Sequence, residues 1–211
     1  MRVYVHRFSF VAIYLVLYFF GTSISATAPS PKVVSLNVCT DQFLMLLADD
    51  SQIISLSEIS TDILSSAMAA EASKYHQNNS GAEEIYLLQP DIVFAGIYTA
   101  KATVNMLESL NIRVEKFEPA STVDQIILNM QRTGELLGHT DRAKLLITNF
   151  ESRLAELTSG IKNKPRAALY YANGYTTGKN TLAGQILDLA GFSNIASEVD
   201  IHWGGTLPLE L

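Results

Sequence analysis

Apolar residues from position 32 onward form short continuous runs that alternate with stretches of helical spacing. The short runs are rich in valine and isoleucine, which is typical of strands buried on both faces. They predict strands over residues 33–36, 53–56, 91–95, 112–117 and 167–171, with a short strand near residue 195. Helical spacing predicts helices over residues 41–48 (capped by Thr40), 61–73, 82–88, 101–110, 122–137 and 182–190, and a longer one from Thr140. This alternation predicts parallel strand–helix–strand units, with helices on both faces of a sheet.

The longest amphipathic stretch begins at Thr140 and separates two series of strand–helix units. Thr140 is a favourable N-cap, and Asp141 lies in the first turn, where a carboxylate meets the positive end of a helix. A Ser-Gly pair at 159–160 permits the helix to end and Pro165 enforces the end, so the helix has roughly 20 residues and a length of about 30 Å. One face is apolar, through Ala143, Leu146, Ile147, Phe150, Leu154 and Leu157. We interpret residues 139–164 as a linking helix between two lobes.

The two lobes that this helix joins are unequal. Residues 32–138 carry four predicted strands, whereas residues 165–211 carry one or two strands and one helix. A unit of about 45 residues buries a poor apolar core by itself. The expected fold is therefore α/β, with two Rossmann-like lobes joined by a single long helix, the second lobe being incomplete. Loops are expected over residues 173–180 and 201–208.

Residues 1–28 have the three-part form of a secretory signal peptide. Arg2, His6 and Arg7 give a basic start, residues 8–20 are apolar, and small polar residues follow. The apolar segment is short for a membrane span. An uncleaved N-terminal anchor is the alternative, but a signal that directs export to the periplasm is the favoured interpretation.

Composition excludes several classes of function. The net charge is −6 and no basic run follows the N-terminus, so nucleic acid is not an expected partner. Cys39 is the only cysteine, which excludes an intrachain disulfide and a zinc site built from cysteines. No G-x-G-x-x-G turn follows the first strand and no G-x-S-x-G motif occurs, so an enzyme is not expected.

Candidate ligand contacts lie in the loops that follow the strands, because parallel α/β sheets bind ligands at the carboxyl ends of their strands. These contacts are Asn37, Cys39, Thr40 and Tyr98 in the first lobe, and Tyr175, His202 and Trp203 in the second. The loops are rich in hydroxyl and aromatic side chains and contain no Arg or Lys before Lys101 and Lys179. Such a lining suits a large flat or amphiphilic ligand. Tyr98 and Tyr175 also fit the role of residues that pack over the sheet ends, and Cys39 that of a small buried residue near a helix start.

Four stretches resemble the periplasmic substrate-binding proteins of the iron-complex and cobalamin uptake class, which serve ABC importers. They are residues 33–57, 82–96, 140–159 and 170–196. The second, AEEIYLLQPDIVFAG, is the most specific, since members typically show an acidic start to a helix, then a leucine, a polar residue, Pro-Asp and an apolar strand. The resemblance covers everything after the signal and implies a ligand held between two lobes with little hinge closure. It also implies a second lobe that continues past Leu211, which agrees with a truncated chain.

The same resemblance implies how the protein meets its partner. Members dock on the transmembrane subunits of the importer through an exposed acidic residue on each lobe, which pairs with arginines. The matching positions are Glu83, with Glu84 beside it, and Glu210. Glu83 and Glu84 also fit the simpler role of carboxylates that stabilise a helix N-terminus.

The expected ligand is a metal chelate bound by a monomer, with no resident cofactor, although the ligand itself carries cobalt or iron. Cobalamin or a related corrinoid is favoured, because anionic siderophores usually require several Arg. Haem is a further candidate, for which Tyr98, Tyr175 or His202 could serve as the axial ligand. The alternatives are a free-metal carrier, which four scattered histidines disfavour, and a non-functional truncated relative.

Overall fold

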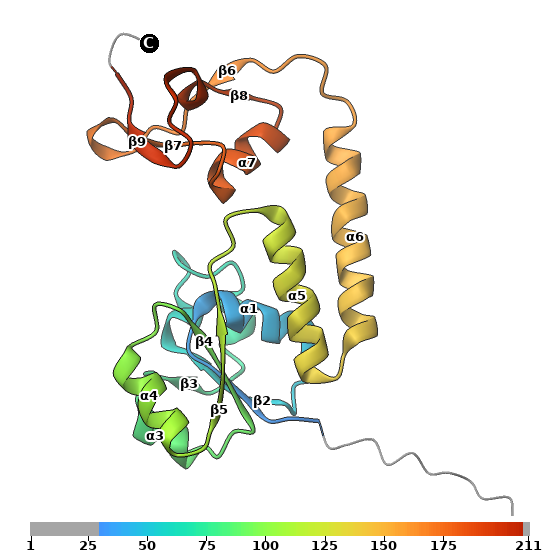
Figure 1. Cartoon of the computed structure of the whole chain (residues 1–211). Coiled ribbons are helices and arrows are strands. Elements are labelled where there is room, and N and C mark those ends of the chain that lie inside the picture. The colour runs from blue at the N-terminus through green and yellow to red at the C-terminus, as the bar shows by residue number, and fades with distance from the viewer. Residues whose placement is uncertain (1–29, 209–211) are drawn as a thin grey trace, which may run out of the picture.

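The computed structural model describes residues 30–208 and shows two lobes linked by helix α6 (Thr140–Thr158) (Figure 1). We call the described residues before α6 lobe one and those after it lobe two. The strands of lobe one are β1 (Val33–Ser35), β2 (Ile53–Ser57), β3 (Gln77–Asn78), β4 (Ile92–Gly96) and β5 (Arg113–Phe117). Its helices are α1 (Val38–Leu47), α2 (Ala69–Ala72), α3 (Ala82–Leu87), α4 (Lys101–Ser109) and α5 (Val123–Leu137), with a 3₁₀ turn at Glu58–Thr61.

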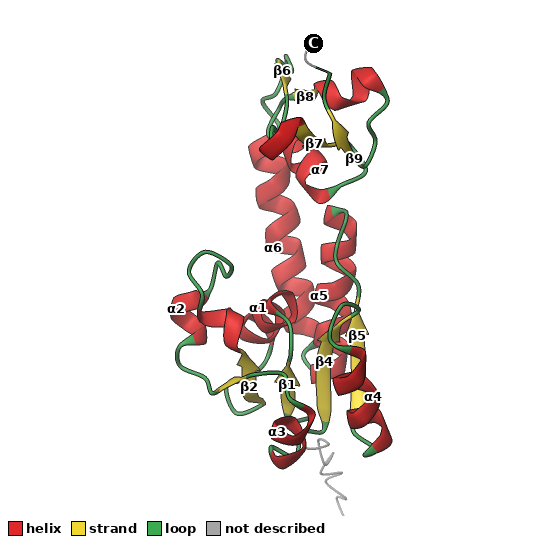
Figure 2. Ribbon diagram, turned by 90° about the vertical axis from the view of Figure 1, so that its left-hand side faces the viewer, coloured by secondary structure: helices red, strands yellow, loops and turns green. Residues whose placement is uncertain are grey.

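The five strands of lobe one form one parallel sheet in the order β3-β2-β1-β4-β5. Figure 2 shows β2, β1, β4 and β5 side by side in this order. Successive side chains of a strand point to opposite faces, so Val33 and Val34 enter different apolar cores. The Val33 core lies under α1 and α5 and the Val34 core under α3 and α4. The expected α/β fold with helices on both faces of the sheet is confirmed, and burial on both faces explains the continuous apolar runs.

Two predicted helices of lobe one differ from the structure. The first begins at Val38 rather than Asp41, because Asn37 is the N-cap and its side chain accepts the Cys39 N–H at 2.8 Å. The helix predicted over residues 61–73 is reduced to Ala69–Ala72. The Asp62 carboxylate accepts hydrogen bonds from the Leu64 N–H and the Ser65 hydroxyl, and such local bonds compete with helical ones.

Helices α5 and α6 pack closely where the chain turns from one into the other (Figure 2). Gly138 ends α5 in the left-handed conformation, with φ 78°, and His139 rather than Thr140 is the N-cap of α6. A Cβ atom on Gly134 would lie 2.4 Å from that of Ala143, so glycine is what permits this approach. Further along α6, Leu146 and Ile147 pack against the core of lobe one, whereas Leu157 is 76% exposed. The helix is thus anchored on lobe one and extends to lobe two, as the sequence predicts.

Lobe two is smaller and contains two separate pairs of strands. Its elements are β6 (Arg166–Ala167), a 3₁₀ turn (Ala172–Gly174), β7 (Tyr175–Thr177), α7 (Leu182–Leu189), β8 (Ser193–Asn194), a second 3₁₀ turn (Ile195–Val199) and β9 (Gly204–Thr206). β6 pairs with β8 in parallel, and β7 pairs with β9 in antiparallel. The predicted loops over residues 173–180 and 201–208 therefore contain strands, whose pairing partners are distant in sequence.

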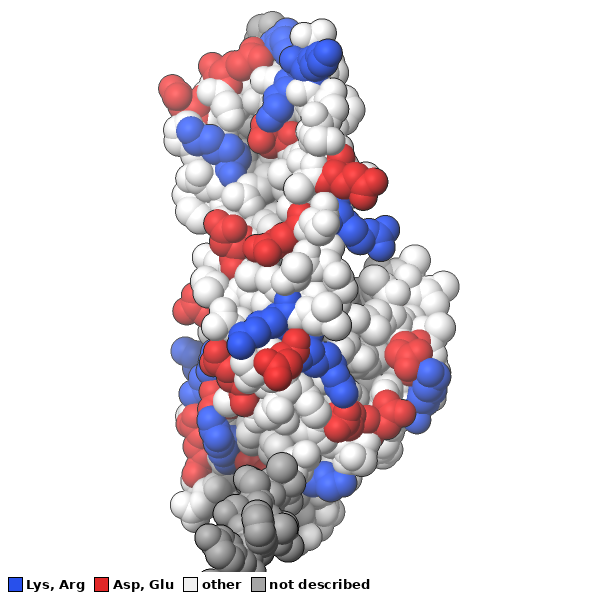
Figure 3. Space-filling view, turned by 90° about the vertical axis from the view of Figure 1, so that its right-hand side faces the viewer, with Lys and Arg blue, Asp and Glu red and all other residues white. Residues whose placement is uncertain are grey.

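No helix among residues 30–208 combines the length and apolar character needed to cross a membrane. On the side of the molecule formed by α6, acidic and basic side chains are interspersed and neither sign gathers into a single patch (Figure 3). The predicted signal at residues 1–28 and the predicted docking residue Glu210 lie outside the described residues.

Candidate functional site

A cavity of about 470 Å³ lies between the two lobes, at the carboxyl ends of the lobe-one strands. We call it the interlobe cavity. Its walls come from the start of α1, the ends of β4 and β5, and from α5 and α6, while Leu182 of α7 is the contribution of lobe two. The apolar wall consists of Phe43, Leu46, Ile97, Phe117, Ile126, Met130, Leu146, Phe150 and Leu182, with Pro119 and Ala120 beside them. A cavity of this size and character is typical of a small-molecule site.

Few polar groups interrupt this apolar wall. They are Asn37, Cys39, Thr40, Gln42, Tyr98, Glu118 and Asn129. Glu118 is the one charged residue among them, and no Lys or Arg of the described chain lines the cavity. The lining therefore favours an extended, largely apolar ligand that carries neutral polar groups.

The turn between β1 and α1 is held rigidly on the cavity wall. The Thr40 hydroxyl donates to the Asn37 carbonyl at 2.9 Å and lies 2.7 Å from the Ser35 hydroxyl. Opposite this turn, a Cβ atom on Gly96 would lie 2.5 Å from the Asn37 amide nitrogen, so a larger residue at this position would require the Asn37 side chain to move. The Thr99 hydroxyl accepts the Gly96 N–H at 3.0 Å, which shapes the loop that presents Tyr98.

A buried carboxyl, Asp41, supports this wall from behind. It accepts hydrogen bonds from both the backbone N–H and the hydroxyl of Ser57, and so joins α1 to the end of β2. Burial raises the pKa of the Asp41 carboxyl, and the hydrogen bonds from Ser57 and Ser35 offset part of this effect. Burial, followed by the charge of Asp41, also raises the pKa of the Cys39 thiol. Cys39 is nevertheless exposed, unlike the small buried residue that the sequence also allowed, and its raised pKa makes the thiol a weaker nucleophile than an ordinary cysteine.

The structure brings together only part of the predicted ligand site. Asn37, Cys39, Thr40 and Tyr98 line the interlobe cavity. The three lobe-two candidates, Tyr175, His202 and Trp203, do not line it and are exposed. They lie in or beside the β7–β9 pair, a pairing that the sequence alone does not reveal.

The apolar residues of the cavity were not predicted as site residues. Phe43, Leu46, Ile126 and Phe150 belong to amphipathic helices, where apolar positions are read as core. One of these residues could have been recognised from the sequence. Phe150 lies on the apolar face of α6, beyond the part of the helix that packs on lobe one. An apolar helix face that continues past its own core must meet another surface.

The two described docking candidates differ in their surroundings. Both lie in the first turn of α3. The Glu84 carboxylate is partly buried and accepts the Asn79 N–H at 2.9 Å, so it stabilises the local turn. Glu83 is exposed. Within residues 30–208, no group of three or more His, Cys, Asp or Glu side chains is placed to hold a metal ion.

The chain belongs to the periplasmic binding protein family, whose sequence profile matches residues 33–208. Among curated proteins it is similar to a cobalamin-binding protein of Halobacterium salinarum, with 26% identity over 184 residues. That match covers 85% of this chain and 50% of the relative, so the chain spans about half the length of the curated relatives it matches.

Solved structures support the same fold. A possible iron-binding periplasmic solute-binding protein of Staphylococcus epidermidis superposes with a TM-score of 0.70 at 18% identity, covering 86% of this chain and 72% of that one. The periplasmic haem-binding protein RhuT of Roseiflexus sp. RS-1 gives 0.69 at 20% identity, and the vitamin B12-binding protein BtuF of Vibrio cholerae gives 0.60 at 16%, with the same two coverages. At these identities the likeness shows the fold, and the ligand remains a separate question.

Proposed function

We propose that this protein is the solute-binding component of an ABC importer and that it captures a metal chelate between its two lobes. The observation that carries the proposal is the interlobe cavity, which is apolar, lies at the carboxyl ends of a parallel sheet and is lined by both lobes. The polar groups of its wall are mostly neutral hydroxyls and amides, which suit binding of a ligand without a chemical reaction.

A corrinoid is the favoured ligand. Its edge carries many neutral amides, and these match the amide side chains of Asn37, Gln42 and Asn129. An anionic siderophore would enter a cavity whose only charged lining residue, among those described, is Glu118, so its metal centre would be desolvated without a cation in the surrounding wall. The curated relative that is named a cobalamin-binding protein supports this preference.

Haem is the second candidate, and Tyr98 is the observation that favours it. This phenol lies on the cavity wall and its side chain is 83% exposed, so it is accessible to an axial metal position. Tyr98→Phe removes the only possible oxygen ligand of that side chain. If haem is the ligand, this change should alter the Soret absorption of the complex, whereas corrinoid binding should be almost unaffected.

Delivery requires contact with the transmembrane subunits of the importer, and Glu83 is the described residue proposed to make it. Its carboxylate is exposed in the first turn of α3. A surface ion pair of this kind contributes about 0–1 kcal/mol, so it would orient the complex more than hold it. We further propose that residues 1–28 direct export and that the protein works in the periplasm as a monomer.

The proposal is tested by titrating the purified protein with cyanocobalamin, haem and a ferric siderophore, following the heat of binding by calorimetry. This signal does not depend on Trp203, which lies outside the cavity, or on a tryptophan introduced by mutation. Leu46→Trp places a larger ring on the cavity wall, and overpacking costs about 1–3 kcal/mol, so binding should weaken about tenfold or more. Leu128→Trp is the matched control, because Leu128 is also an exposed helical leucine of lobe one but does not line the cavity.

Saturable binding of one compound that Leu46→Trp weakens and Leu128→Trp leaves unchanged would support the proposal and identify the ligand class. Binding that both variants leave unchanged would place the ligand elsewhere and contradict the site.

A further inference from the structure

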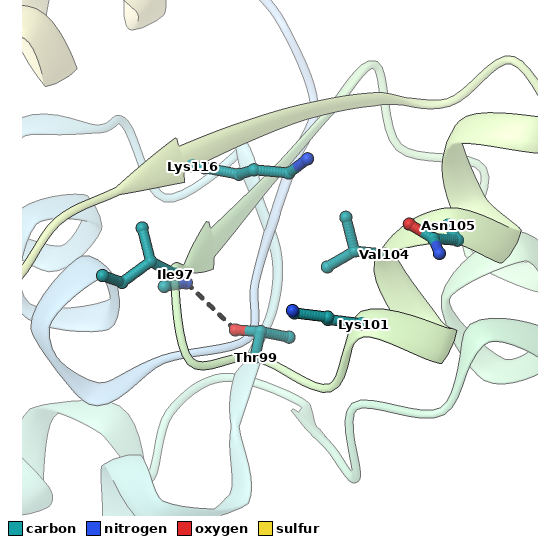
Figure 4. A pocket seen from close by; sticks show the side chains of 7 residues that line it. Ile97, Thr99, Lys101, Val104, Asn105 and Lys116 are labelled. Carbon is teal, nitrogen blue, oxygen red and sulfur yellow. Dashed lines mark hydrogen bonds between the residues drawn. The ribbon is translucent and has the colours of Figure 1, made fainter.

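A second cavity, of about 280 Å³, adjoins the interlobe cavity at the end of β4 (Figure 4). Gly96 and Ile97 line both cavities, so the turn from β4 into α4 separates them. The remaining lining residues are Thr99, Lys101, Val104, Asn105 and Lys116. We call this space the lysine pocket. It lies between the edge strand β5 and helix α4, on the sheet face opposite α5.

Two cations approach the lysine pocket from opposite sides. Lys116 extends from β5 and Lys101 from the first residue of α4, with Ile97 and Val104 between them (Figure 4). The Lys116 ammonium pairs with the Glu108 carboxylate at 2.8 Å, which compensates one of the two charges. Lys101 forms no ion pair with any described residue. The pocket therefore carries one uncompensated positive charge.

Neutral donors stand beside this charge. The Thr99 hydroxyl already accepts the Gly96 N–H, so its own proton is available to donate. Asn105 contributes an amide at the other end of the pocket (Figure 4). An ammonium, a hydroxyl proton and an amide NH₂ together match the lone pairs of a carboxylate.

The lysine pocket and the interlobe cavity are complementary in charge. Among the described residues, the interlobe cavity has an apolar wall with Glu118 as its only charged residue, whereas the adjoining pocket is lined by Lys101 and Lys116. We propose that the lysine pocket binds a carboxylate on the rim of the chelate that occupies the interlobe cavity, with Lys101 as the residue that selects an acidic over a neutral rim group. The inference rests on the proposed function, and it names the chemistry of the bound ligand more narrowly.

The test compares pairs of ligands that differ only in rim charge. One pair is haem and its dimethyl ester, and the other is a cyanocobalamin monocarboxylate, in which one rim amide is hydrolysed, and cyanocobalamin itself. The wild-type protein should bind the acid of at least one pair about tenfold more tightly than its neutral partner, which is the size expected for a charge-assisted hydrogen bond. The pair that shows the preference tells whether the bound carboxylate belongs to a haem or to a corrinoid.

The matched variants test whether the preference for an acidic ligand comes from the lysine pocket or from the general surface charge of the protein. Lys101→Ala should reduce the acid-to-neutral preference to about one- to threefold, and Lys101→Arg should retain it. Lys74→Ala is the control, because Lys74 is an exposed lysine of lobe one that pairs with Glu71 and lines neither cavity. It should leave the preference unchanged.

Each outcome decides between the two proposals. A wild-type protein that binds acid and neutral forms equally, or a preference that survives in Lys101→Ala, would overturn the lysine pocket and leave the proposed function standing. Loss of the preference in Lys74→Ala as well would attribute it to net charge and also overturn the pocket. If none of the four compounds binds while a ferric siderophore does, the inference is overturned and the proposed function stands. If no chelate binds, the proposed function fails and the inference fails with it.

Discussion

The two lobes differ most in how they bury apolar side chains. Lobe one has two apolar cores, one on each face of a five-stranded sheet. In the described part of lobe two, the buried apolar side chains are Ala196 and Leu207. Five of its aromatic residues are exposed, namely Tyr170, Tyr171, Tyr175, Phe192 and Trp203. Similar strand–helix patterns thus give a closed core in one lobe and an open surface in the other.

This difference shows that a strand–helix pattern is not sufficient to form an apolar core. Lobe one places helices on both faces of its sheet, so each strand residue meets a second layer. Lobe two divides its strands into two pairs, β6–β8 and β7–β9, and one helix of eight residues accompanies them. A two-stranded pair is too narrow to cover large side chains on either face. The same difference explains why the wall of the interlobe cavity comes almost entirely from lobe one.

The largest expected effect follows from a matched pair of phenylalanines. Phe94 is completely buried and its ring centroid lies 5.0 Å from that of Phe117, whereas Phe192 of lobe two is 37% exposed. Phe94→Ala should lower the free energy of unfolding by about 3–5 kcal/mol, and Phe192→Ala by less than about 1 kcal/mol. Urea unfolding followed by circular dichroism measures both. Equal losses would show that lobe two is as tightly packed as lobe one.

A smaller effect is expected from a matched pair of tyrosines. Tyr98 lines the interlobe cavity, whereas Tyr175 lies in β7 with its ring centroid 6.3 Å from that of Tyr171. Tyr98→Ala should weaken binding of the preferred chelate about three- to tenfold, because one aromatic contact is worth about 0.5–1.5 kcal/mol. Tyr175→Ala should leave binding unchanged in the same titration. A comparable loss in Tyr175→Ala would mean that the β7–β9 pair forms part of the site.

A pH-dependent effect is expected at Asp41 in lobe one. Because burial raises the pKa of this carboxyl in the folded state, the folded protein favours its protonated form. The resulting stabilisation is complete below the ordinary aspartate pKa of about 4 and is lost as the pH rises through the raised pKa. Asp41→Asn removes this titration, so the stability of the variant relative to wild type should increase from about pH 4 to about pH 7. A difference that is constant across urea unfolding curves at both pH values would contradict the assignment.

The smallest effect is expected at Glu198 in lobe two, where the sign is reversed. The bidentate hydrogen bond from Arg166 lowers the pKa of the exposed Glu198 carboxyl. Its stabilisation is present above the ordinary glutamate pKa and is lost as the pH falls through the lowered pKa. Solvent and salt screen an exposed pair of this kind, so Glu198→Gln should change the midpoint of urea unfolding very little. A clear loss that is insensitive to added salt would show that the pair is more important than its exposure suggests.

Much of the fold of lobe one could be predicted from local sequence. The runs around Val33, Ile53 and Ile92 give strands, and the helix predicted over residues 122–137 matches α5, which Thr122 and Gly138 cap. The errors came where side chains form local hydrogen bonds. Asn37 displaces Thr40 as the cap of α1, and Asp62 stabilises turns in place of a helix.

The candidate site could be predicted only in part, for a different reason. Asn37, Thr40 and Tyr98 follow strands of one parallel sheet, and the topology of such a sheet brings their loops to one edge. Tyr175 begins β7 and Trp203 immediately precedes β9, but in lobe two the pairing of these strands is non-local and antiparallel. Residue spacing does not reveal this pairing. The rule that ligand contacts follow the strands of a parallel sheet therefore holds for lobe one and fails for lobe two.

By itself, the sequence determined the parallel sheet, the long helix α6 and the family, because these depend on local periodicity and on stretches of contiguous residues. Only the tertiary structure decided which apolar helix faces become cavity wall, as for Leu46 and Phe150, and that Lys101 and Lys116 lie on opposite sides of one pocket. An apolar residue has the same periodicity whether it meets a core or a ligand. Lys101 lies on a helix and Lys116 on a strand, and the two line one pocket only because that helix packs against that strand.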